Sequence, residues 1–85
     1  MSDELELLDQ LLGHNEPLAV MRQLFSSTER FVRAATAMLT AGDIRLLDED
    51  GIDIPAWRWR QVLAEQPLAP YFLSITDQGV KRFSL

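Results

Sequence analysis

Arginines and threonines recur at helical spacing in the middle of this chain. Arg30, Arg33, Thr36 and Thr40 fall on one side of a predicted helix, with Ala37 among them, and no carboxylate follows the helix's first turn. Guanidinium and hydroxyl groups on such a face can contact phosphates and base edges. The face is therefore a candidate nucleic-acid surface, although an ordinary solvated helix face has the same composition.

Further cations could flank that face. We expect Arg22, from the preceding helix, to touch a phosphate backbone, and Arg58, Arg60 and Lys81 to add phosphate contacts. The stretches that carry these cations are mildly basic, but the whole chain has a net charge of −5. Affinity for nucleic acid comes mostly from cations on phosphates, so this balance opposes strong non-specific binding.

Residues suited to catalysis or metal binding are scarce. The chain has no cysteine and one histidine, His14, which we interpret as a polar residue of a Gly-His-Asn turn. The acidic turn Asp48–Gly51 does not match the spacing of a calcium-binding loop. We therefore expect no enzyme activity, no metal and no cofactor.

Length and composition indicate a single domain over residues 1–85. Apolar residues make up 47% of the 85 residues, which suffices for one modest core. No apolar run approaches the length of a membrane span, and the acidic beginning is not typical of a secretory signal. A cytoplasmic protein without membrane contact is the expectation.

The central helix has clear boundary signals. Ser26 and Ser27 are both suitable N-caps, and Gly42 is a suitable stop because glycine adopts the left-handed conformation at low cost. One apolar face is expected between them, made of Phe31, Ala34, Ala35, Met38, Leu39 and Ala41.

Two helices are expected before the central one. The first spans residues 2–12, capped by Ser2 and stopped by Gly13; Leu5, Leu8 and Leu12 share a face that Leu7 and Leu11 widen. This wide leucine stripe faces the core on one interpretation and forms part of a dimer interface on the other.

The second helix is expected to open at Asn15–Glu16–Pro17, with Asn15 as its cap. Its apolar side would consist of Leu18, Val20, Met21, Leu24 and Phe25.

In the second half of the chain the sequence pattern predicts two short strands, over residues 44–47 and 71–75, and a loop at 67–70. Residues 56–66 between them fit a helix capped by Asp53, and also a strand with alternating Trp and Arg; we favour the helix. In the helix Ala56, Trp59, Val62 and Leu63 face the core, and Trp57 is partly exposed.

Two stretches resemble winged helix-turn-helix regulators of the MarR and PadR type. Ile44–Leu47 follows a helix with the residue pattern of a recognition helix, and Tyr71–Ile75 runs into Thr76-x-x-Gly79, which is similar to the strand-to-helix exit from a wing. Phe25 stands where the turn of the motif usually has glycine. The residues of the first pattern are Leu24, Ser27, Phe31, Ala35, Met38 and Gly42.

The resemblance implies a small α+β, winged-helix-like domain. It would have three N-terminal helices, a two-to-three-stranded antiparallel sheet and an extra short helix between the wing strands. The implied function is DNA binding in transcription regulation, with the helix 27–41 used for recognition. The alternative is an acidic winged-helix module that binds protein without DNA, and the leucine-rich helix 3–12 would then serve a protein partner or a homodimer.

Overall fold

The described part of the chain forms five helices and a three-stranded antiparallel sheet. The computed structural model describes residues 3–12, 16–64 and 71–84; the predictions made at Ser2, Gly13, His14, Asn15 and residues 65–70 lie outside these ranges. In chain order the elements are α1 (Asp3–Leu11), β1 (Glu16–Pro17), α2 (Leu18–Gln23), α3 (Thr28–Ala41), β2 (Ile44–Leu47), α4 (Ala56–Ala64), β3 (Phe72–Ile75) and α5 (Asp77–Ser84).

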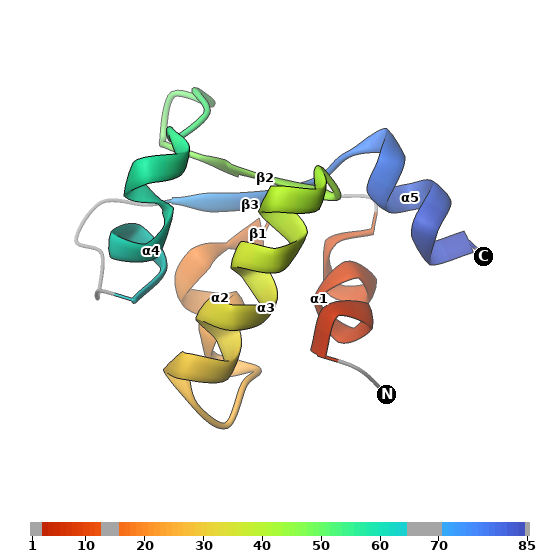
Figure 1. The fold of residues 1–85 in the computed structure, drawn as a ribbon, viewed down its shortest axis with the longest axis horizontal. Helices are drawn as coiled ribbons and strands as arrows, with labels where there is room; N and C mark the ends of the chain where they lie inside the picture. Colours follow the sequence, from red (N-terminus) through yellow and green to blue (C-terminus); the bar gives the residue numbers. More distant parts are fainter. Residues whose placement is uncertain (1–2, 13–15, 65–70, 85) are drawn as a thin grey trace.

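The sheet has the order β1-β3-β2, so the last strand lies between the other two. Strands β2 and β3 pair antiparallel, with Leu46 opposite Leu73, as the two short strands were expected to do. Helix α3 crosses in front of the sheet, and α4 and α5 lie at opposite ends of it (Figure 1). The coarse α+β prediction, including a helix between the two main strands, is thus confirmed.

The start of the second helix was predicted wrongly. Glu16 and Pro17 do not form its first turn but pair with Leu73 and Phe72 as the edge strand β1, and the helix begins at Leu18. Proline is tolerated here because an edge strand leaves one side of its backbone without ladder partners.

Helix α3 has the predicted boundaries. Its N-cap is Ser27, whose hydroxyl accepts a hydrogen bond from the Arg30 backbone N–H at 3.1 Å, and Gly42 ends it with φ of +85°. Five of the six predicted core residues are buried, whereas Ala41, in the last turn, is exposed.

The apolar faces of the first two helices are narrower than predicted. In α1 the buried residues are Leu7, Leu8 and Leu11, while Leu5 is exposed. In α2 only Leu18 and Met21 are buried, because a six-residue helix presents little more than one turn to the core. The predicted core residues Val20 and Leu24 are exposed, and Phe25 packs edge-on against Phe31 with ring centroids 5.5 Å apart.

The segment from residue 48 to residue 64 contains a tight turn and a helix. Asp48 accepts hydrogen bonds from the backbone N–H groups of Asp50 and Ile52, and Gly51 takes φ of +78°, which confirms the predicted turn. Residues 56–64 form helix α4, so the strand alternative is wrong over this range.

Asp53 does not cap helix α4. Both of its carboxylate oxygens accept hydrogen bonds from Arg45, at 2.9 and 2.8 Å, three residues before the helix begins. Within the helix, Trp59 packs on the core and donates from its indole nitrogen to the Ile54 carbonyl at 2.8 Å. Ala56 is exposed against expectation, and Trp57 is 81% exposed.

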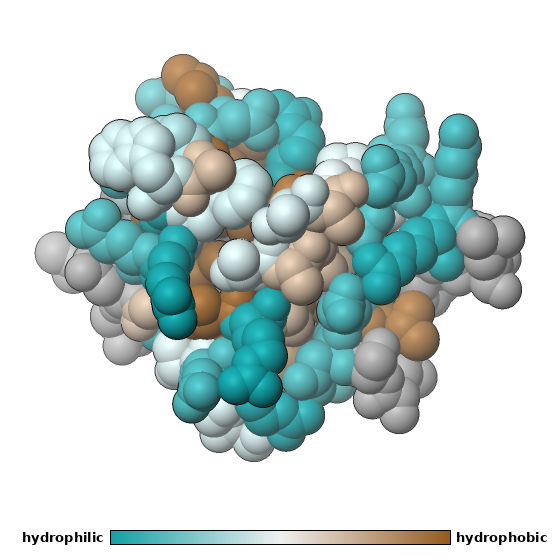
Figure 2. Space-filling model, in the orientation of Figure 1, coloured by the Kyte–Doolittle hydropathy of each residue, from teal (hydrophilic) through white to brown (hydrophobic). Residues whose placement is uncertain are grey.

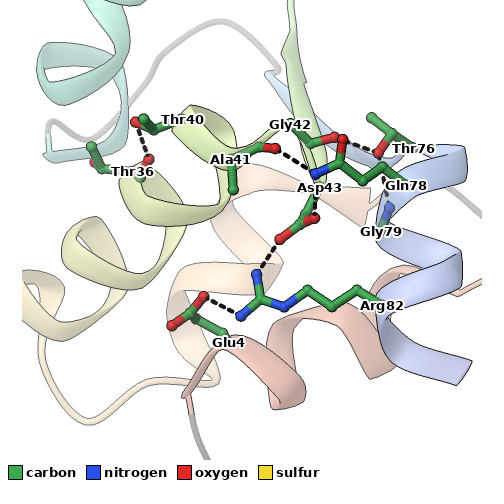
Figure 3. A network of polar contacts seen from close by, with 10 residues as sticks. All are labelled: Glu4, Thr36, Thr40, Ala41, Gly42, Asp43, Thr76, Gln78, Gly79 and Arg82. Carbon is green, nitrogen blue, oxygen red and sulfur yellow. Dashed lines mark hydrogen bonds and ion pairs between the residues drawn. The ribbon is translucent and has the colours of Figure 1, made fainter. Parts of the chain in front are cut away.

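A polar network joins the end of α3 to α5 and α1 (Figure 3). Its centre is Asp43, which is 1% exposed and the only buried polar or charged residue of the described chain. The Asp43 carboxylate accepts hydrogen bonds from Arg82 and from the Gln78 amide. Arg82 reaches Glu4 of α1 with its second nitrogen at 3.0 Å, and the two carboxylates raise the pKa of Arg82, Asp43 more than Glu4.

The start of α5 fits tightly against the same turn. The Thr76 hydroxyl donates to the Gly42 carbonyl at 2.6 Å, and it accepts from the Gly79 N–H at 3.1 Å. A Cβ atom at Gly79 would lie 2.2 Å from the Asp43 carbonyl oxygen. Glycine is therefore required at this position by contact with neighbouring backbone.

We expect Gly79→Ala to lower the free energy of unfolding by at least about 1 kcal/mol. Alanine's helix propensity would favour the change by about 1 kcal/mol. A methyl group 2.2 Å from a backbone oxygen belongs to the severe end of overpacking, which costs about 2–3 kcal/mol or more. Gly51→Ala is the matched control, because its Cβ would meet nothing within 4 Å and only its positive φ is strained. Urea unfolding of the two variants gives the comparison, and a neutral or stabilising Gly79→Ala would contradict the contact.

We expect Arg82→Met to cost about 2 kcal/mol at neutral pH, because it leaves the Asp43 carboxylate buried without its cation. The value is below that for a fully buried pair because the Arg82 side chain is 44% exposed. The double variant Asp43→Asn/Arg82→Met buries no charge and should regain part of the loss. Urea unfolding measures the free energy of unfolding of the single and the double variant, and Lys81→Met is a control on the same helix. An equal loss of stability in the single and double variants would contradict the role of the ion pair.

Candidate interaction surface between α3 and α4

Helix α4 lies beside α3 and is tied to α2. Val62 and Leu63 bury its inner side, and its packing partner along the chain is α3. At its end, Arg22 of α2 donates from Nη2 to the Ala64 carbonyl oxygen at 2.8 Å. Arg22, predicted as a phosphate contact, thus supports the position of α4.

A groove of about 560 Å³ runs between the outer sides of α3 and α4. Apolar and small side chains form much of its lining: Val32 and Ala37 from α3, and Ala64 from α4. Arg33 and Arg60 border it from the two helices. Figure 2, drawn from the same side as Figure 1, shows pale and brown groups in the middle of this face with hydrophilic groups around them.

A smaller hollow of about 330 Å³ lies on the other side of α3, against α1. Arg33 and Ala37 line both hollows, so they form the ridge between them. The α1 side is acidic, because Asp3 and Glu4 border it. The outer face of α3 is therefore flanked by α4 on one side and by carboxylates of α1 on the other.

Arg30, a predicted base or phosphate contact, is engaged by α1. Its guanidinium donates to both carboxylate oxygens of Asp3, at 2.6 and 3.2 Å, and to the Ser26 hydroxyl at 2.9 Å. An arginine bound on two edges by a carboxylate and a hydroxyl must lose these contacts before it can bind another anion.

Arg33 and Thr36 differ in what they offer to solvent. Arg33 is paired with Glu29 one turn earlier at 3.1 Å, and both side chains are largely exposed, so the pair is weak and easily exchanged. The Thr36 hydroxyl oxygen is buried and makes no hydrogen bond within the described structure. Thr36 therefore does not present its hydroxyl to a ligand in this conformation.

The remaining predicted cations are divided between the two ends of the molecule. Arg60 lines the groove, Arg58 is half-buried on the same helix, and Lys81 is exposed on α5 at the opposite end (Figure 1). The structure thus brings together Arg33, Thr36 and Arg60 of the predicted set, and it leaves Lys81 apart from them.

A further exposed ion pair, between Arg45 of β2 and Asp53, lies on the far side of the turn that follows β2. The hydrogen bonds between Arg45 and Asp53 lower the pKa of Asp53 and raise that of Arg45. Arg45 is therefore not an additional cation for the α3 surface.

Sequence reasoning missed the apolar part of the groove. Val32 and Ala64 were not among the candidate residues, although each stands one helical turn from a groove residue, Val32 between Thr28 and Thr36 and Ala64 after Arg60. This four-residue spacing was the available signal. It was not decisive because nothing local shows that α4 packs beside α3.

The described residues contain no group of three His, Cys, Asp or Glu side chains that could hold a metal ion. Across the same ranges, no helix has both the length and the apolar character needed to cross a membrane. No family model, no curated protein and no solved structure matches the chain.

Proposed function

We propose that this chain is a protein-interaction module with a winged-helix-like architecture, and that its partner binds between α3 and α4. The observation that carries the proposal is the apolar-lined groove of about 560 Å³ on the outer face of α3. Concave, mostly apolar surfaces with a few charged groups at their edges are typical of sites that receive a partner side chain or helix.

The winged-helix part of the proposal rests on topology together with the resemblance. Three helices precede the paired strands β2 and β3, and the short strand β1 completes the sheet in the order β1-β3-β2. A helix-turn-helix followed by an antiparallel ribbon has this order of elements. Such an architecture does not fix the partner, since one fold serves unrelated functions.

Nucleic-acid binding is the second candidate, favoured by the position of Arg33 and Arg60 on the two sides of the groove. The magnitude of the charge argues for ranking it second. With Arg30 engaged by Asp3, the cations at the groove are Arg33 and Arg60, and Arg58 on α4 brings the number of phosphate contacts to about three at most. Tight DNA binders make about 6–10 such contacts, and this chain has a net charge of −5.

Site-specific cross-linking should identify the class of partner. We expect a photo-reactive amino acid at position 37, on the ridge beside the groove, to form a protein adduct in cells that express the chain. The same amino acid at position 41 is the control, because Ala41 is exposed on the same helix but does not line the groove. A nuclease-sensitive adduct, or no adduct beyond that at position 41, would contradict protein binding at this surface.

We also expect no binding of duplex DNA at physiological ionic strength up to about 10 μM protein, because so few phosphates can be neutralised. Fluorescence anisotropy with a labelled duplex, measured over a range of salt concentrations, tests this. Binding that persists at physiological salt and weakens on Arg33→Ala, with Lys81→Ala as control, would establish the second candidate instead.

A further inference from the structure

The outer face of α3 is bordered by charges that are already paired, with one exception. Asp3 is bound by Arg30, and Glu4 is bound by Arg82. Glu29 is bound by Arg33. Arg60 lines the groove, and its exposed side chain makes no hydrogen bond or ion pair among the described residues.

This imbalance specifies what a partner must supply. A segment that covers the groove would remove water from Arg60, and burying a guanidinium without an opposite charge is costly. A carboxylate placed against Arg60 offsets that cost, and the fork of the guanidinium suits a carboxylate geometrically. A cation at the same place would be repelled.

The apolar lining specifies the rest of the partner's surface. Ala37 and Ala64 are small, so a backbone can come close to the two helices, and Val32 supplies an apolar wall that packs on the core. A helix whose apolar side chains recur at i, i+3, i+4 and i+7 presents the matching ridge.

Resting on the proposed protein-binding function, we infer that the groove between α3 and α4 binds an amphipathic helix of a partner protein that places an Asp or Glu side chain against Arg60. The acidic flank of that helix faces α4. Its apolar ridge lies on Val32, Ala37 and Ala64, and its other flank passes over Arg33 toward the acidic edge of α1.

Selection from a displayed peptide library tests this inference directly. The probe is a library of amphipathic helices of about 20 residues, long enough to form stable helix, with a fixed leucine ridge and randomised flanks. We expect the wild-type chain to enrich Asp or Glu at a flank position, and Arg60→Glu to enrich Lys or Arg at the same position. Lys81→Glu is the matched control: it changes the net charge equally but lies on α5, so it should select as the wild type does.

Binding measurements on the selected peptides complete the test. We expect the best wild-type peptide to bind Arg60→Glu about three- to tenfold more weakly, the range for an exposed charge pair that becomes repulsive. Ala37→Arg should abolish binding of every selected peptide, while Ala41→Arg should not. Circular dichroism and urea unfolding show whether each variant is folded.

Three results would overturn the inference. They are failure to enrich any helix, enrichment without an acidic position, and an acidic preference that Arg60→Glu leaves unchanged. None of these results would decide the proposed function, which the cross-linking experiment tests separately. A protein adduct at position 37 does not depend on the partner being an acidic helix. A nuclease-sensitive adduct, by contrast, would remove the proposed function itself.

Discussion

The burial of the Asp43 carboxylate constrains how the rest of the chain is arranged. Helix α3 ends at Gly42 and strand β2 begins at Ile44, so the side chain between them turns into the interior, where an unpaired charge would be costly. The cation that meets it comes from α5, which fixes that helix against the turn. Because Arg82 also binds Glu4, the first turn of α1 is held near the same point and places Asp3 beside Arg30. One buried carboxylate thereby leads, through two ion pairs, to the neutralisation of a predicted recognition residue.

This chain of contacts explains why the outer face of α3 is less basic than its own sequence indicates. Within the helix, Arg30 and Arg33 oppose only Glu29, but in the folded chain Asp3 comes from a helix that is far away in sequence. Individual exposed ion pairs contribute little, about 0–1 kcal/mol, so the pairing adds little stability. Its effect is on recognition, because a bidentate carboxylate must be displaced before Arg30 can bind a phosphate. For this reason we place protein binding before DNA binding in the proposed function.

Local signals predicted much of the fold, and the failures share one physical cause. The cap and stop of α3, its buried face, strands β2 and β3, and the helix between them follow from periodicity and turn residues. Strand β1 could not be predicted in this way, since its two residues form a strand only because β3 lies beside them. The role of Asp53 was predicted wrongly because its partner Arg45 is across a turn, and the pairing of Arg30 with Asp3 depends on the packing of α1. The groove was missed for the same reason: most of its lining comes from α3, but Arg60 and Ala64 come from α4, and no local pattern reveals that the two helices are adjacent.

Helix α4 is what separates this surface from an ordinary solvated helix face. Few of its residues are buried, so one side is left to form a wall opposite α3, and the hydrogen bond from Arg22 to Ala64 anchors its end. It stands in the connection between β2 and β3, where a simple hairpin would leave the side of α3 open. A long connection costs little entropy beyond that of a short one, so the insertion is cheap to accommodate. Helix α4 converts the convex outer face of α3 into a concave, apolar-lined groove. A concave groove fits a side chain or helix of a partner protein better than it fits the regular surface of a DNA duplex. The helix inserted between β2 and β3 thus supports, in this chain, the proposal of a protein-binding groove.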